Sequence, residues 1–512
     1  MATLLADDLE RRLGPPDDEA LRRRDEQGTV TALAAAAGPD LRLSFVPAAA
    51  GGTLASLEET LALARAAARR DATVMPATMF GITATTAVLI GGTAAQRAEV
   101  VDLAGAGRTV AFAVSERDHD ADPLAGTCAL VDTPDGPVLR GRKWRVGTGP
   151  HTTAALVLAR TGGRGPAAFS LVVVRDPALR AARVADRGAD GWRGVAFADL
   201  AFDDVAVSPD DVVGGPDGVG RGIELMLRAM QVVRVTSTAA GLGAMDLALR
   251  VAREDGAAGP VATAELEAAA VAATAAEVHA RVAARALHTA PGQQALGSSA
   301  VKWVVTELTD EVFDRAADVL GFSAVLAGPF AIARRDAALA RYVDTDPHAN
   351  LDLLAAALRR LALRPTGPRN PGEELAAAVT FGAALPAFDP AGTALAGRDE
   401  MLLDGLPALV DALRAGGGDP ELLARAEATD ADVRALLAAI AVPGLAPPQL
   451  ATLAARGAFL HAAAACVHVA ASGSHEPRAR LLAATDLLRA RAAGTRRTPD
   501  ASHDRTHPEV TR

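Results

Sequence analysis

The sequence predicts a mostly α-helical protein with a β insert and a further helical region at its C-terminal end. Apolar residues make up 50% of the 512 residues, yet aromatic residues make up only 3%. Alanine and leucine, both strong helix formers, therefore supply most of the apolar content. Helical periodicity is interrupted once, by short β-prone runs within residues 111–215. The chain has the length of about three domains and can bury a large core.

Composition also limits the function and the compartment. The net charge is −10, and a mildly acidic surface argues against nucleic acid as the main partner. The two cysteines, Cys128 and Cys466, match no metal-ligand spacing, which indicates a reducing, cytoplasmic compartment. The first residues, MATLLADDLERRLG, are acidic and lack a long apolar core, so we expect no signal peptide.

Residues 1–110 are expected to form an N-terminal helical domain. Leu57, Leu61 and Ala64 recur at helical spacing. The apolar run from Val74 to Gly92 is long enough to suggest a membrane span. It contains one proline, three glycines and several threonines, however, so we expect a buried core helix and no span.

Residues 111–215 are expected to form a middle β domain. The segment CALVDTPDGPVLRGRKWRV reads as two strands joined at Pro134-Asp135-Gly136, which is a strong hairpin signal. Further runs of strand length follow it: TAALVLAR, AFSLVVV and GVAFADLAF.

Residues 216–365 are expected to form a helical bundle. A long amphipathic helix begins at Gly222, and the glycines and proline of residues 256–260 end it. Further helical patterns cover about 263–290, 297–320 and 350–362, and four long segments with short breaks predict an antiparallel arrangement.

The remaining residues form two further regions. Three prolines within residues 365–371 mark a linker, and residues 372–494 have the composition of a helical C-terminal extension. Residues 495–512 are polar and contain two prolines, which predicts a disordered tail.

The order of helices, strands and bundle, together with several short segments, resembles the acyl-CoA dehydrogenase family. The resemblance covers about residues 20–365 and implies an N-terminal helical domain, a β-barrel-like middle domain and a C-terminal helical bundle. The extension suggests the larger, oxidase-like or very-long-chain-like members. The segments that carry the resemblance are FAVSERDHDAD at 112–122, GRKWRVGTG at 141–149, FDDVAVSP at 202–209 with GVG at 218–220, and RDA at 335–337.

This resemblance implies a redox reaction. In the family, a carboxylate removes the α-proton of an acyl thioester while the β-hydride passes to a flavin, and hydrogen-bond donors hold the developing enolate. The resemblance thus implies FAD as cofactor and an acyl-CoA or an acyl-carrier protein as substrate. It also implies an electron-transfer flavoprotein or oxygen as electron acceptor, and a homo-oligomer.

Asp344 lies where one large group of the family carries its glutamate base, eight residues after Asp336. Burial beside an acyl chain and a flavin would raise the pKa of a carboxylate toward the range that proton abstraction needs. Aspartate is one methylene shorter than glutamate, which matters for a step that requires close approach. The alternative is a turn or helix-capping residue ahead of Pro347.

The resemblance implies further site residues, although each also has an ordinary structural explanation, such as a strand-end serine or a bundle arginine. The residues implied for cofactor binding are Ser115, Arg145, Gly147, Thr148, Asp318, Gly321, Asp346 and His348. The residues implied for substrate binding are Ala121, Asp122, Gln231 and Arg234.

Three departures from the family pattern put the retention of FAD in question. Residues 117–121 replace a glycine-rich turn, and we interpret them as a solvated polar loop rather than a metal site. Arg145, Val146 and Gly147 occupy the positions of a Trp-Ile-Thr group, and residues 253–260 lack an aromatic. Two functions therefore stay open beside an α,β-dehydrogenase: a catalytically degenerate scaffold or partner subunit, and a flavin monooxygenase-type tailoring enzyme.

Overall fold

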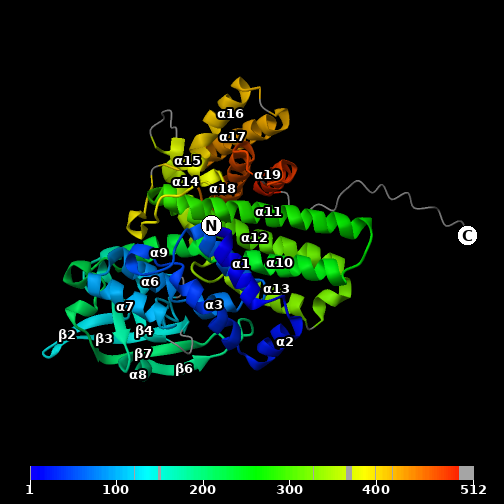
Figure 1. Ribbon diagram of the computed structural model, residues 1–512. Coiled ribbons are helices and arrows are strands. Elements are labelled where there is room, and N and C mark those ends of the chain that lie inside the picture. The colour runs from blue at the N-terminus through cyan, green and yellow to red at the C-terminus, as the bar shows by residue number, and fades with distance from the viewer. Residues whose placement is uncertain are drawn as a thin grey trace, which may run out of the picture.

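The structure is a computed structural model, and Figure 1 shows the strands at one end of it, the long bundle helices in the middle and the C-terminal helices on the opposite side. The order of helices, strands and helices confirms the predicted fold class. The residues that the structure describes are 2–119, 122–147, 152–326, 328–364, 372–397, 399–417, 419–474 and 476–494.

The N-terminal region is helical. The run from Val74 to Gly92 is buried, as expected, but the expectation of one helix was wrong, because the chain breaks at Phe80 and Gly81. A Cβ atom at Gly81 would lie 3.1 Å from the backbone of Val110, so the break lets the chain pass close to the first strand. The helices are α1 (Ala2–Leu13), α2 (Asp18–Gln27), α3 (Thr31–Leu43), α4 (Leu57–Ala68), α5 (Val74–Met79), α6 (Ile82–Gly91) and α7 (Ala94–Gly105).

The middle region is a mixed sheet with the strand order β1-β4-β2-β3-β7-β6, and β5 pairs with β4. Thr133 lies opposite Gly136 at the end of the β2–β3 ladder, which confirms the predicted hairpin. β1 is parallel to β4, whereas β5 is antiparallel to it. The strands are β1 (Thr109–Ala113), β2 (Ala129–Thr133), β3 (Gly136–Gly147), β4 (Thr152–Arg160), β5 (Phe169–Arg175), β6 (Arg183–Arg187) and β7 (Phe197–Ala206).

The bundle contains the long helices of the central layer. The stretch expected as one helix from Gly222 divides at Ser237. The hydroxyls of Thr236 and Thr238 on either side bond to backbone carbonyls of the preceding turn, a pattern that bends helices. The helices are α9 (Gly222–Thr236), α10 (Thr238–Asp255), α11 (Pro260–Thr289), α12 (Gln294–Leu320), α13 (Pro329–Ala340) and α14 (Pro347–Ala362).

Within the described part of the chain, two helical stretches are long and apolar enough to cross a membrane by length and composition alone. They are Gly222–Asp255 and Pro447–Ala471, and a third arises if Pro291–Val325 and Pro329–Ala340 are taken together as one bent span. The apolar windows of the first two are 89% and 67% buried inside the protein, so their apolar surface is used largely in packing. The absence of a membrane span stays a prediction.

The C-terminal extension packs on the bundle as part of one continuous hydrophobic core, which runs from Leu9 to Ala492. Helix α18 contacts both α12 and α14. The helices of the extension are α15 (Gly372–Val379), α16 (Met401–Ala415), α17 (Pro420–Ile440), α18 (Pro447–Ala471) and α19 (Arg478–Ala492).

A buried chain of polar groups joins the bundle to this extension. His279 Nε2 on α11 lies 2.9 Å from His461 Nδ1 on α18, and His461 Nε2 lies 3.0 Å from Glu400 Oε1. Glu400 also accepts a hydrogen bond from Leu403 N at 2.7 Å, which caps α16. These hydrogen bonds give partners to the His461 ring nitrogens and the Glu400 carboxylate, which burial would otherwise leave without any.

Two more buried histidines bond to the backbone of the extension. His288 Nε2 accepts a hydrogen bond from Leu57 N, so its Nδ1 donates to Pro386 O at 2.8 Å. His468 Nε2 lies 2.9 Å from Leu402 O. Burial lowers the pKa of His288 and of His468, and it lowers the pKa of His279 well below its usual value, with a further contribution from neighbouring His461.

These histidines predict acid destabilisation. A histidine whose folded-state pKa is depressed stabilises the fold fully above its unfolded pKa of about 6.5, and that stabilisation decreases as the pH falls below this value. We therefore expect the melting temperature to be lower at pH 5.5 than at pH 7.5. The loss should be smaller in a His468→Gln variant, whereas the exposed control His348→Gln should behave as the unmodified chain does. An identical pH slope in all three proteins would contradict the assignment.

Candidate functional site

A cavity of about 600 Å³ lies between the sheet and the bundle, within the volume range of small-molecule and cofactor sites. Its wall comes from β1, β3 and β7 on one side and from α9, α14 and the α13–α14 loop on the other. Helix α6 and Phe80, at the break between α5 and α6, complete it. Its lining residues are Phe80, Thr83, Phe112, Val114, Ser115, Pro123, Trp144, Arg145, Val146, Gly147, Phe197, Met226, Leu227, Met230, Arg234, Tyr342, Val343, Asp344, Thr345, Asp346, Ala349, Asp352 and Leu353.

A bulge in β3 shapes the sheet side of the cavity. The pairing with β7 shifts between Lys143 and Val146, and Arg145 between them has φ 50°. Trp144 N donates to Ser115 O at 2.9 Å, and the Arg145 guanidinium lies 4.7 Å from the centre of the Trp144 ring. Bulges redirect side chains at functional sites, and this one brings both residues to the cavity wall.

The α13–α14 loop supplies a carboxylate. Asp344 has φ 68° and a side chain that is 9% exposed. Its Oδ2 lies 3.7 Å from Lys302 Nζ and has no hydrogen-bond partner. Lys302 Nζ donates to Ala340 O at 2.6 Å, at the end of α13. Burial lowers the pKa of Lys302, and the Asp344 carboxylate opposes that shift.

A second buried cation binds the same loop from α9. Arg234 Nε donates to Thr345 Oγ1 at 2.8 Å, and its NH1 lies 3.5 Å from Ser299 Oγ. Its NH2 is buried without a partner. Burial lowers the pKa of Arg234 to about 10, which leaves the guanidinium charged at neutral pH. Two cations from two helices therefore fix the loop that carries Asp344.

The cavity brings together six of the residues that the sequence implied. Asp346 also caps α14, by accepting from His348 N at 2.9 Å. Ala121 and Thr148 lie outside the described residues. The six residues are Ser115, Arg145, Gly147, Arg234, Asp344 and Asp346.

Five other implied residues do not line this cavity. Asp122 accepts from Leu124 N beside it, Gln231 Nε2 donates to Ala394 O in the extension, and His348 is exposed. Asp318 lies in the last turn of α12 and Gly321 directly follows this helix, so both are at least about 24 Å along its axis from Lys302.

The wall fits the ring system of a flavin. Aromatic side chains, including Phe112, Trp144 and Phe197, suit a flat apolar ring, and the backbone of Gly147 lies among them. The cationic lining side chains in the described part of the wall are Arg145 and Arg234. Arg145 is exposed and suits a phosphate, so it is the residue of this chain that would face the charged part of the cofactor. The described residues contain no group of three or more side chains suited to a metal ion.

Lys302, which lies beside Asp344, is a residue that sequence reasoning missed. The signal was available, since Lys143 and Lys302 are the two lysines among 52 basic residues. Both are buried, and each lies beside a carboxylate, with 2.9 Å between Lys143 Nζ and Glu116 Oε1. Lysine is almost never fully buried unless it is paired. Two lysines in a chain whose other basic residues are all arginine were therefore candidates for interior ion pairs.

Comparison with known proteins identifies the fold. Residues 111–205 match the family model for the acyl-CoA dehydrogenase middle domain. No curated protein matches the chain by sequence. An acyl-CoA dehydrogenase in complex with FAD from Bacillus anthracis is 16% identical and has a TM-score of 0.73. The match covers 96% of this chain and 86% of that one, so it extends into the C-terminal extension.

Two further structures match a shorter part of the chain. Butyryl-CoA dehydrogenase from Megasphaera elsdenii is 18% identical with a TM-score of 0.63, covering 69% of this chain and 96% of that one. The prolyl acyl carrier protein oxidase AnaB is 15% identical with a TM-score of 0.60, covering 69% and 97%. These findings confirm the resemblance of the middle region to the acyl-CoA dehydrogenase family, and the structural matches show that the chain has the same fold.

The ion pair beneath the cavity makes a testable contribution to stability. A Lys302→Met variant should lose about 3 kcal/mol in the free energy of unfolding, because it leaves a buried carboxylate without its cation. Adding Asp344→Asn should restore part of the loss, since the double variant no longer buries the carboxylate that Lys302 neutralised, while the charged Arg234 stays buried. Urea unfolding measures both changes, with Arg140→Met as a control that breaks the exposed pair with Asp204. A Lys302→Met variant as stable as that control would refute a buried ion pair.

Proposed function

Because the chain has the acyl-CoA dehydrogenase fold, we propose that it is a flavin-dependent acyl-thioester α,β-dehydrogenase with Asp344 as its base. The observation that supports this most directly is the position of Asp344, which faces both the cavity and an adjoining apolar pocket with a buried oxygen that has no hydrogen-bond partner. The acyl group would be carried by CoA or by an acyl-carrier protein, since the structural neighbours include proteins named for each.

The chain's own residues would act as follows. The Asp344 carboxylate accepts the α-proton, while Lys302 and Arg234 hold its loop in place from two helices. The unpartnered NH2 of Arg234 is a buried donor that can stabilise negative charge on the thioester oxygen. A flavin bound against Trp144 and Phe197 would supply the hydride acceptor.

The same proposal includes the compartment, the oligomeric state and the electron acceptor. We place the protein in the cytoplasm as a homo-oligomer that passes electrons to a flavoprotein carrier or to oxygen. A degenerate scaffold subunit is the competing proposal, supported by the altered flavin-contact segments around Arg145 and residues 253–260. A flavin monooxygenase-type enzyme would not need Asp344 as its base.

The decisive variant is Asp344→Asn. The variant should keep its bound flavin but reduce anaerobic bleaching of the flavin by an acyl-CoA by at least about a hundredfold, because general-base catalysis contributes that much. Stopped-flow absorbance measures the rate, and Asp411→Asn on the exposed face of α16 serves as the control. Unchanged bleaching in Asp344→Asn would remove the base assignment. A colourless protein that takes up no FAD would favour the scaffold subunit.

A further inference from the structure

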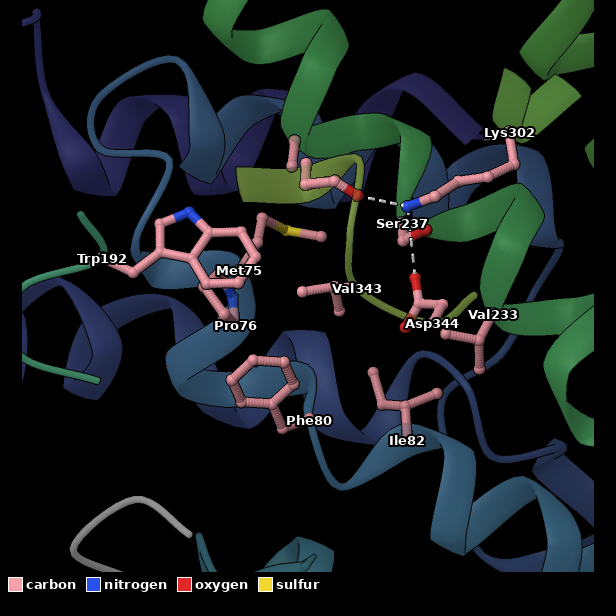
Figure 2. Close-up of a pocket in the computed structure, with 12 residues that line it drawn as sticks. Met75, Pro76, Phe80, Ile82, Trp192, Val233, Ser237, Lys302, Val343 and Asp344 are labelled. Atoms are coloured by element: carbon pink, nitrogen blue, oxygen red, sulfur yellow. Dashed lines mark hydrogen bonds and ion pairs between the residues drawn. The ribbon is translucent and has the colours of Figure 1, made fainter. Parts of the chain in front are cut away.

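A small pocket of about 50 Å³ adjoins the main cavity, and Phe80, Val343 and Asp344 line both spaces. Figure 2 shows that its two ends differ. Lys302, Ser237 and Asp344 gather at one end, whereas Trp192, Met75 and Pro76 lie at the other. A group that enters beside the carboxylate therefore extends toward an apolar and aromatic end wall.

The volume limits how much of an acyl chain fits. An engineered apolar cavity of about 150 Å³ holds benzene, which corresponds to about 25 Å³ for each carbon atom. By that measure, the pocket accepts about two carbon atoms beyond those that lie beside the carboxylate. The carbonyl carbon and the reacting α and β carbons come before these two, so the acyl group has about five carbons at most.

The end wall is fixed by contacts on both of its sides. Trp192 N donates to Asp336 Oδ1 at 2.8 Å, and the residue is 5% exposed. The Trp192 and Phe80 rings pack edge to face with centroids 6.0 Å apart, and Phe80 packs on Phe197 in the same way at 5.7 Å. Such aromatic pairs stabilise each other beyond their area of contact, so lengthening the pocket requires displacing three rings.

The charges around the pocket limit the chemistry of its occupant. Two buried cations, Lys302 and Arg234, accompany one carboxylate, Asp344, so an ammonium group on the acyl chain would meet excess positive charge. A carboxylate at the far end of the chain would lie against Met75, Pro76 and the Trp192 indole, whose single N–H cannot replace the hydration of a charged group.

We infer that this pocket selects thioesters of short, neutral, aliphatic acyl groups of up to about five carbons, and that Trp192 limits the chain length. The inference rests on the dehydrogenase function proposed above and specifies its substrate class. It distinguishes this chain from its structural neighbour named as a prolyl carrier protein oxidase, because a prolyl group carries an ammonium.

The first test compares butyryl-CoA with octanoyl-CoA on the flavin-loaded protein. The value of kcat/KM for anaerobic flavin reduction should be at least about tenfold higher for butyryl-CoA, since unaccommodated methylenes cost at least that much. A second readout needs no turnover, because calorimetry measures the binding of both thioesters to the Asp344→Asn protein. A longer chain ordinarily binds more tightly because it buries more apolar surface, so equal or weaker binding of octanoyl-CoA supports a closed pocket.

The second test opens the end wall. A Trp192→Ala variant should raise the octanoyl-to-butyryl ratio by at least about tenfold, and its backbone N–H to Asp336 is retained. If the Trp192→Ala variant does not fold, Met75→Ala at the same end of the pocket serves in its place. It should shift the ratio in the same direction. Met245→Ala is the matched control, because this methionine is equally buried but lies outside the pocket, and it should leave the ratio unchanged.

The outcomes separate the two proposals. Octanoyl-CoA or a prolyl thioester acting as well as butyryl-CoA would overturn the pocket assignment while leaving the dehydrogenase intact. Absence of flavin reduction by every thioester would overturn the dehydrogenase. In that case, calorimetry with the two CoA esters still decides on the pocket, and preferential binding of octanoyl-CoA would reject the short-chain assignment.

Discussion

Burying a charge is costly unless an opposite charge accompanies it, and this constraint organises the centre of the molecule. Asp344 lies in the interior beside Lys302 of α12, while Arg234 of α9 bonds to the next residue in the loop. The spacing of α9 and α12 therefore sets the position of the loop between α13 and α14. Both the large cavity and the small pocket take part of their wall from that loop.

Much of the fold could be predicted because its signals are local. The hairpin at residues 133–136 follows from its turn residues, and the long helices follow from their periodicity. The two helix breaks that were missed depend on distant contacts or on hydroxyl groups within helices. Gly81 lies against the backbone of Val110, and the break at Ser237 accompanies two threonine hydroxyls that bond to the preceding turn. The pattern of apolar residues in the sequence predicts neither the close backbone approach at Gly81 nor the hydroxyl bonds beside Ser237.

The site was predictable only in part, for a related reason. The family resemblance implied Asp344, eight residues after Asp336, as the base, and this residue lines the cavity. Trp144 was not among the implied site residues, but the β3 bulge, which depends on cross-strand partners, brings it to the wall. Trp192 belongs to no motif and reaches the pocket through tertiary packing alone. Lys302 carried a compositional signal, but its partner became clear only when the bundle and the loop were seen together.

The wall that closes the small pocket is supported from outside. Asp336 on α13 accepts hydrogen bonds from Trp192 N and Arg335 Nε, and Arg335 NH1 in turn lies 3.1 Å from Asp25 on α2. A substitution in this support would tilt the indole without touching any ligand. Substitutions that change the packing of α2 and α13 thus offer an evolutionary route to new acyl substrates. A comparison limited to the residues that face the ligand would not detect this route.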